Sequence, residues 1–113
     1  MKYLLLIYDD PKVWETFPEA EVNKVMAEYR DFSKQIAESG HMIGGSQLQP
    51  ASSATTVRMR DGKRLVHDGP FAETREVLGG YYLVEAKDLD EALGLAARIP
   101  SARFGTIEVR PLM

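Results

Sequence analysis

Residues 2–8 of the chain, KYLLLIY, form a continuous apolar run that ends at the turn-forming sequence Asp9-Asp10-Pro11. A short apolar run that ends in this way is typical of a β-strand buried on both faces. Because side chains alternate along a strand, one face carries Tyr3, Leu5 and Ile7 and the other carries Leu4, Leu6 and Tyr8. The run therefore predicts a central strand whose sheet needs cover on both sides.

Two amphipathic helices are predicted to cover one side of this sheet. The first begins after Pro18, has acidic residues in its first turn and ends at Gly40. Its apolar residues recur every three or four positions, at Val22, Val25, Met26, Tyr29, Phe32 and Ile36. The second is capped by Asp88, with Glu91 placed to complete a capping box. Its expected inward residues are Leu89, Ala92, Leu93 and Ala96.

The remaining strands and a hairpin follow from alternation and turn signals. The predicted strands cover residues 41–49, 81–86 and 106–110. Residues 54–60 and 64–67 alternate around Asp61-Gly62, a dipeptide typical of a tight β-hairpin turn. This order predicts an α+β fold, a ferredoxin-like sandwich with an inserted β-hairpin.

Two helices can cover only one face of such a sheet, so a second copy of the chain is expected to cover the other. An interface of about 1,600 Å², roughly two-thirds apolar, contributes about 25 kcal/mol of gross stabilisation. The cost of association is ~4 to 15 kcal/mol. We therefore expect a homodimer through the open sheet face, with a ligand cleft between the stacked sheets and residues 68–76.

Composition narrows the class of protein. The 113 residues predict one domain, and the 44% hydrophobic and 27% charged content is that of a globular protein. A net charge of -3 with scattered basic residues argues against nucleic acid as a partner. Without cysteine and with two histidines, neither a metal site nor a cofactor is expected. The apolar run at residues 3–8 is too short to span a membrane and no signal-peptide pattern follows, which predicts a cytoplasmic location.

Residues 68–76, DGPFAETRE, gather specialised residues in one connection. Gly69 and Pro70 restrict the backbone, so they hold Asp68 at a corner. The polar groups that follow suit acid/base chemistry or anion binding, with Phe71 as an anchor; they are Glu73, Thr74, Arg75 and Glu76. The alternative is a structural loop in which Asp68 caps backbone N–H groups and Arg75 pairs with a neighbouring glutamate.

The run DGPFAETRE, preceded by RLVH and followed by LGGYYLVEA, resembles the DGPF group of the YCII-related family, whose usual form is DGPF-x-E-[TS]-[KR]-E. MKYLLLIY, ATTVRMRDGKRLV, DLDEAL and IEVRPLM are also similar to that family's pattern, so the resemblance covers nearly the whole chain. It implies a dimeric α+β barrel, in which ferredoxin-like units pair through their open sheet faces.

The resemblance also implies a chemistry. Relatives in the superfamily include muconolactone isomerase-like proteins and dehydrohalogenases or lyases, in which a His–Asp pair is thought to move protons. Asp68 matches the motif aspartate, but Tyr29 stands where the family often has a histidine on the first helix. A tyrosine is a poor general base unless its pKa is strongly lowered. His67 stands where a small residue is common, whereas His41 is expected at the surface.

Two functional hypotheses follow. In the first, the protein is a small-molecule enzyme in which Asp68 or Glu73 accepts a proton and Tyr29 or Thr74 stabilises an oxyanion. Its other candidate site residues are His67 for catalysis and Tyr8, Phe71, Arg75 and Glu76 for substrate binding. In the second, the same cleft binds a ligand without turnover, in an accessory module. The resemblance implies an extracytoplasmic-function sigma factor as a partner of such a module.

Overall fold

The computed structural model describes residues 1–113 and contains two antiparallel sheets and three α-helices. The main sheet has the strand order β2-β5-β1-β6, and the smaller one pairs β3 with β4. The strands of the two sheets are β1 (Lys2–Asp9), β2 (Met42–Gln47), β3 (Thr55–Arg60), β4 (Lys63–Asp68), β5 (Val77–Glu85) and β6 (Thr106–Pro111). The helices of the protein are α1 (Pro11–Glu15), α2 (Glu19–Glu38) and α3 (Leu89–Ala97), with short 3-10 turns at Ala51–Ser53 and Pro100–Arg103. The predicted α+β, ferredoxin-like class is confirmed.

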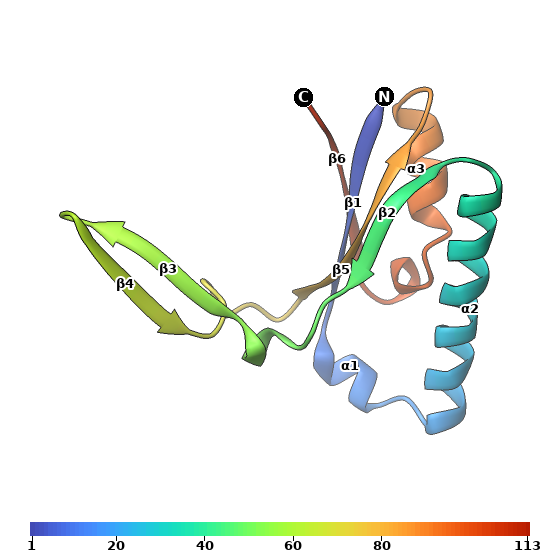
Figure 1. Cartoon of the computed structure of the whole chain (residues 1–113). Coiled ribbons are helices and arrows are strands. Elements are labelled where there is room, and N and C mark those ends of the chain that lie inside the picture. Colours follow the sequence, from blue (N-terminus) through green and yellow to red (C-terminus); the bar gives the residue numbers. More distant parts are fainter.

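Helices α2 and α3 lie on the same face of the main sheet (Figure 1). The predicted stripe of α2 faces the sheet, because Val25, Phe32 and Ile36 are buried and Tyr29 packs against the core. From the sheet, β1 contributes its odd-numbered residues and β5 contributes Tyr82 and Val84. Phe32 and Tyr82 meet edge to face, with 5.2 Å between ring centroids. The core therefore lies between the helices and one side of the sheet.

The opposite face of the main sheet carries no helix (Figure 1). Its central pairs are Leu4 opposite Leu83 and Leu6 opposite Tyr81, and the neighbouring β6 places Glu108 beside Leu6. These four apolar side chains are only half-buried. We call this surface the open face. It is the apolar surface that the alternation of β1 predicted.

The β3–β4 hairpin, residues 55–68, forms an arm that extends away from the rest of the molecule (Figure 1). Its turn has φ of 52° at Asp61 and 74° at Gly62, the two positive angles that a type I′ hairpin turn requires. The register pairs Val57 with Val66. The arm is paired as the sequence predicted, but only its own two strands share its hydrogen-bond ladder.

The inward stripe of α3 was predicted only in part. Ala92 and Ala96 are buried as expected, but Leu89 and Leu93 are 49% and 47% exposed, and Leu95 is buried in their place. The sheet-facing arc of this helix continues into Ile99, and Leu89 and Leu93 lie to one side of it.

The capping box at α3 is also incomplete. Asp88 accepts a hydrogen bond from the Glu91 N–H at 2.9 Å, as predicted. The Glu91 carboxylate, however, accepts from the Lys87 N–H at 3.3 Å and lies 3.0 Å from His41 Nε2. His41 is therefore half-buried in a contact between β2 and α3 instead of lying free at the surface. None of the helices has the length and apolar character needed to cross a membrane.

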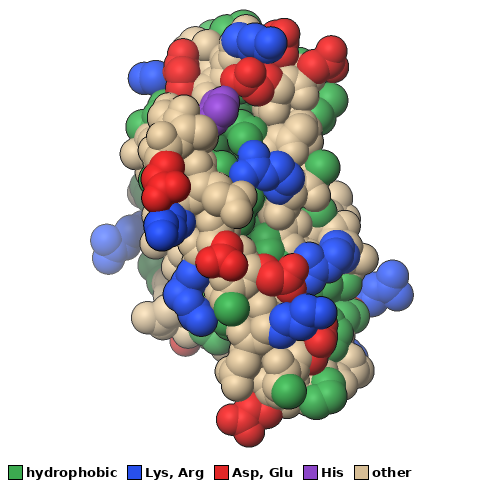
Figure 2. All heavy atoms as spheres, turned by 90° about the vertical axis from the view of Figure 1, so that its right-hand side faces the viewer, with side chains coloured by type: hydrophobic (Ala, Val, Ile, Leu, Met, Phe, Trp, Pro, Cys, Tyr) green, Lys and Arg blue, Asp and Glu red, His purple; other side chains and the backbone are tan.

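Figure 2 views the molecule from the side of the helices and shows acidic and basic side chains interspersed over it. No large area of a single sign covers this surface, which agrees with the scattered charges of the sequence.

Candidate functional site

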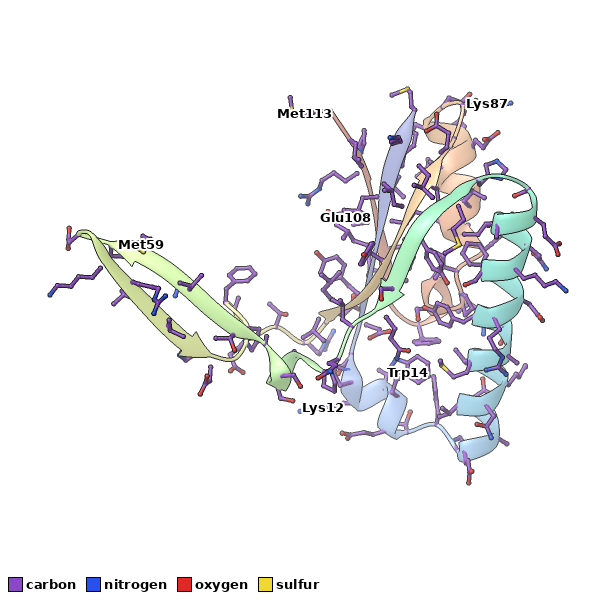
Figure 3. The ribbon with its side chains drawn as sticks, viewed as in Figure 1. Lys12, Trp14, Met59, Lys87, Glu108 and Met113 are labelled. Carbon is purple, nitrogen blue, oxygen red and sulfur yellow. The ribbon has the colours of Figure 1, made fainter.

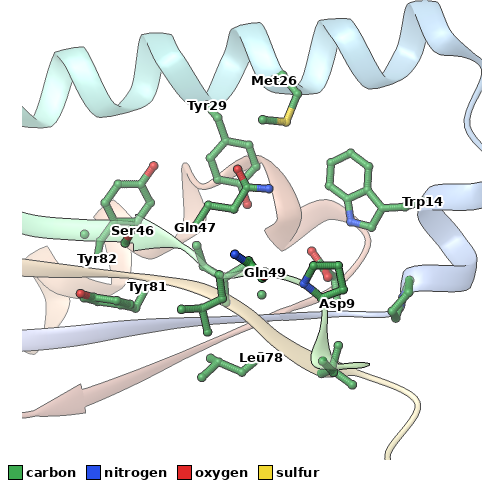
Figure 4. Close-up of a pocket in the computed structure, with 18 of the residues that line it drawn as sticks. Asp9, Trp14, Met26, Tyr29, Ser46, Gln47, Gln49, Leu78, Tyr81 and Tyr82 are labelled. Atoms are coloured by element: carbon green, nitrogen blue, oxygen red, sulfur yellow. The ribbon is translucent and has the colours of Figure 1, made fainter. Parts of the chain in front are cut away.

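A pocket of about 560 Å³ opens between α2, the short helix α1, β2 and the carboxyl end of β1. We call it the helix-side pocket. Its wall is mostly apolar and includes Trp14, Met26 and Tyr82, and its polar groups include Asp9 and Tyr29 (Figure 4). Among its lining residues, Asp9 alone carries a formal charge at neutral pH.

The local sequence explains how α1 brings Trp14 to this pocket. Asp10 caps the helix by accepting a hydrogen bond from the Lys12 N–H at 2.9 Å, and Pro11 occupies the first turn. Trp14 packs edge to face on Phe17 and Phe104, at 5.6 Å and 5.3 Å between centroids. These contacts hold the indole against the pocket (Figures 3 and 4).

Three polar side chains form a hydrogen-bonded chain in which Tyr29 and Asp9 line the pocket and Ser101 lies buried behind it. The Tyr29 hydroxyl lies 2.5 Å from Ser101 Oγ, and Ser101 Oγ donates to Asp9 Oδ2 at 3.4 Å. Ser101 is fully buried. When Ser101 donates its proton to Asp9, the Tyr29 hydroxyl must be the donor to Ser101. The chain joins the middle of α2 to the end of β1.

Burial raises the pKa of the Tyr29 hydroxyl from 10.0 to about 12. The negative charge of Asp9 and the nearby Tyr82 act in the same direction, whereas the hydrogen bond with Ser101 lowers the pKa. Tyr29 therefore keeps its proton at neutral pH, so it can donate a hydrogen bond and cannot serve as a base.

A second phenol has similar surroundings. The Tyr82 hydroxyl lies 2.7 Å from Ser33 Oγ, and both residues line the helix-side pocket. Burial raises the pKa of Tyr82, and the hydrogen bond with Ser33 partly offsets this. The phenols of Tyr29 and Tyr82 are therefore neutral, and they share the pocket with the Asp9 carboxylate.

Gly105 leaves the space that the end of β1 occupies, whereas Gly79 lies beside Asp9 at an ordinary contact distance. A Cβ on Gly105 would clash with the Tyr8 carbonyl oxygen and lie 3.0 Å from the Asp9 Cβ. A Cβ on Gly79 would lie 3.5 Å from Asp9 Oδ1. The close approach at Gly105 requires glycine, because a Cβ cannot come so near to backbone atoms. The end of β1 is therefore held tightly in place.

A second hollow, of about 770 Å³, lies where the arm joins the sheet, and we call it the arm-base hollow. It brings together four of the residues that the sequence predicted for substrate binding: Tyr8, Phe71, Thr74 and Glu76. Phe71 is 80% exposed, so it does not anchor the loop within this protomer. Thr74 Oγ1 donates to the Glu76 carbonyl oxygen at 2.6 Å and shapes the loop.

Four other predicted site residues, Asp68, His67, Glu73 and Arg75, lie outside both hollows. Asp68 and His67 are exposed at the end of β4, and strand alternation puts their side chains on opposite faces of the arm. Glu73 and Arg75 are exposed in the loop that follows. Tyr29 lies in the helix-side pocket, so the structure does not bring it together with Asp68.

The contacts that the structural-loop alternative predicts are absent from the structure. Asp68 caps no backbone N–H, and Arg75 forms no ion pair with Glu73 or Glu76. Instead, Thr56 Oγ1 donates to the Gly69 carbonyl oxygen at 2.7 Å and secures the base of the arm.

Sequence reasoning missed Asp9, Trp14 and Ser101 as site residues. Asp9 had a usable signal, because a carboxylate directly after a buried strand lies where strand ends open into pockets. Ser101 had none, since its role depends on residues 72 and 92 positions away in the chain. No group of His, Asp or Glu side chains is clustered so as to hold a metal ion.

Comparison with known proteins agrees with the family resemblance of the sequence. The model of the YCII-related domain matches residues 1–113. A protein of Rhizobium meliloti (strain 1021), described as uncharacterized, is 38% identical over 114 residues, which cover 99% of this chain and 92% of that protein. Because the domain model matches residues 1–113 and this relative is 38% identical over 99% of the chain, the chain belongs to the YCII-related family.

Proposed function

We propose that the protein is a small-molecule enzyme that transfers a proton in the helix-side pocket. The observation that carries this proposal is the chain Tyr29–Ser101–Asp9, which sets a carboxylate and a neutral phenol on one pocket wall. A carboxylate can accept a proton, and a neutral phenol can stabilise the oxyanion that forms. The reaction class is that of an isomerase, a lyase or a dehydrohalogenase.

The lining of the pocket indicates the kind of substrate. Aromatic and aliphatic side chains favour a small ring compound, because flat apolar surfaces stack well on Trp14 and the two tyrosines. The only charged group is Asp9, which repels an anion placed against it. We therefore expect an uncharged, mainly apolar ring compound that bears a carbonyl or hydroxyl group.

In this reaction Asp9 takes a proton from a carbon or hydroxyl of the substrate. In an isomerisation it returns the proton to another atom of the substrate; in an elimination the leaving group departs with the electron pair and Asp9 releases the proton to solvent. The Tyr29 O–H turns from Ser101 toward the substrate oxygen and donates a hydrogen bond to the developing negative charge. Ser101 Oγ then donates to the Tyr29 oxygen, since either atom of that pair can be the donor. Ser101 acts as a positioning residue and Asp9 and Tyr29 as the catalytic residues.

The arm-base hollow is the second candidate location for the chemistry. Four residues that the sequence singled out line it, and Asp68, Glu73 and Arg75 lie on the adjoining arm and loop. In this version Asp68 or Glu73 is the base and Thr74 supports the oxyanion. The hollow lies beside the open face, so it needs a second copy of the chain to close it.

A homodimer through the open face is part of the proposal. Leu4, Leu6, Tyr81 and Leu83 form an apolar surface that only a partner can remove from water. Stacked sheets lie ~10 Å apart, the spacing that such side chains fill. The partner that fits this surface is another copy, because the same surface then covers itself about a twofold axis.

The test compares three variants in a pool of metabolites followed by mass spectrometry. The wild-type chain should consume a ring compound, and Asp9→Asn should slow this by ~10²-fold or more because the amide cannot accept the proton. Tyr29→Phe should lower kcat more than it raises KM, since its hydrogen bond strengthens in the transition state.

Asp68→Asn is the matched control on the arm and should retain activity. Loss of turnover in Asp68→Asn with full activity in Asp9→Asn would move the chemistry to the arm-base hollow. A ligand that stabilises the wild-type chain in thermal shift without being consumed would instead support a ligand-binding accessory module.

A further inference from the structure

Because of the arm, the molecule is more extended than a compact domain with the same number of residues. The radius of gyration is 16.0 Å and the principal extents are 48 × 40 × 18 Å, whereas a compact domain of this size has a radius of about 13 Å. An isolated two-stranded hairpin is at best marginally stable in water. An arm with no packing partner in its own chain would therefore be stabilised by a partner from another chain.

The two faces of the arm differ in chemistry. The register places Val57, Val66 and Met59 on one face, which we call the apolar arm face; its polar members are Arg64, opposite Met59, and Thr55 and Asp68 at the base of the arm. Their side chains are 60%, 60% and 59% exposed. The other face carries mostly basic groups around Leu65, namely Arg58, Arg60, Lys63 and His67. One face of the arm is thus suited to packing and the other to water.

The arm extends on the same side of the main sheet as the open face. In Figure 3, Met59 lies at the far end of the arm, on the same side of the main sheet as Glu108 and opposite the helices. Six residues of strand span ~20 Å, about twice the ~10 Å between stacked sheets. The arm is therefore long enough to pass a second sheet placed on the open face.

The open face by itself is too small for a stable dimer interface. Four strands spaced ~4.8 Å apart and ~20 Å long present roughly 400 Å², about half of the ~800 Å² that each partner buries in a stable complex. The apolar arm face and the exposed Phe71 continue this surface beyond the sheet. Together they approach the size that a stable dimer needs.

We propose that the arm is a dimer clasp: two copies stack their open faces, and each arm lays Val57, Met59 and Val66 along its partner's body. This rests on the dimer proposed above and adds an element that the sheets alone do not require. The partner then covers the arm-base hollow, so that each such hollow is completed by both chains. The basic face of the arm stays in water.

Val66 and Leu65 are adjacent in the sequence but lie on opposite faces of the arm, so substitutions at these two positions provide a matched test. In sedimentation equilibrium, Val66→Glu should weaken the dimer about tenfold or more, because the charge would be buried without a partner. Leu65→Glu, on the basic face, should leave the dissociation constant within about threefold. Equal effects of the two variants would overturn the proposed orientation of the arm.

The absence of native cysteine permits a direct measurement on the same two positions. Above the dissociation constant, the single thiol of Val66→Cys should react with a maleimide at least about tenfold more slowly than that of Leu65→Cys, since a covered thiol reacts only when the arm detaches. On dilution the difference should vanish.

The outcomes separate this inference from the dimer itself. A dimer in which both thiols react equally fast would reject the clasp and retain stacking of the sheets. Protection at Val66→Cys that persists in the monomer would mean that the arm folds back on its own chain, which also rejects the clasp. A chain that stays monomeric at every concentration would reject both proposals.

Discussion

At the scale of single residues, Tyr29 lies on the core side of α2, yet its hydroxyl reaches polar groups from two distant parts of the chain. Ser101 and Asp9 come from the 3-10 turn before β6 and from the end of β1. The phenol is thereby held in the protonated state, and its neighbour Asp9 remains the only carboxylate in the pocket. Tyr29 is the proton donor because burial beside the Asp9 carboxylate raises its pKa, and Asp9 is the proton acceptor.

The raised pKa of Tyr29 predicts how stability depends on alkaline pH. Below pH 10 the hydroxyl is protonated in both the folded and the unfolded chain, so its contribution is fully present. Between pH 10 and about 12 the unfolded chain releases this proton first, so the free energy of unfolding falls.

Urea unfolding at several pH values should therefore show a steeper decline for the wild-type chain than for Tyr29→Phe. Tyr81→Phe, which removes a phenol from the open face, is the control and should retain the steeper decline. Parallel curves for wild type and Tyr29→Phe would contradict the assignment.

At the scale of elements, α3 shows how a short helix is positioned by its first turn. Asp88 caps the helix, and Glu91 contacts both the Lys87 N–H and His41 at the start of β2. The glutamate thereby links α3 to an edge strand of the main sheet. The helix start therefore contributes to tertiary structure as well as to its own helix.

We expect Asp88→Ala to lower the free energy of unfolding by about 1 kcal/mol, because the Glu91 N–H loses its acceptor. Asp90→Ala is the matched control, since it removes a carboxylate from the same turn and leaves the cap in place. Its effect should stay within about 0.5 kcal/mol. Equal losses in urea unfolding would show that charge near the helix start, and not the cap, provides the stability.

At the scale of the whole molecule, the main sheet has its core on one side and half-buried apolar groups on the other. The arm, on which Val57, Met59 and Val66 are exposed, extends from the side of the sheet opposite the helices. An exposed apolar sheet face of this kind is typical of an interaction surface.

Self-association predicts that the melting temperature rises with protein concentration, because mass action favours the folded dimer. Leu83→Glu, on the open face, should abolish this dependence and give a monomer by light scattering. Leu93→Glu, on the exposed side of α3, is the control and should leave the dimer intact. A melting temperature that is independent of concentration in the wild-type chain would count against the dimer.

Local features of this protein could be predicted from its sequence because they depend on near neighbours. The stripe of α2, the Asp61-Gly62 turn and the Asp88 cap each follow from residues a few positions apart. The apolar open face also follows, since strand alternation converts an uninterrupted apolar run into two apolar surfaces.

The site required the tertiary structure. The sequence pointed to Asp68 because glycine and proline surround it, but the arm carries that residue away from Tyr29. Asp9 meets Tyr29 through Ser101, which lies 92 positions from the first and 72 from the second. Local order in the chain defines the strands, turns and helices, whereas packing between distant segments decides which carboxylate faces a pocket.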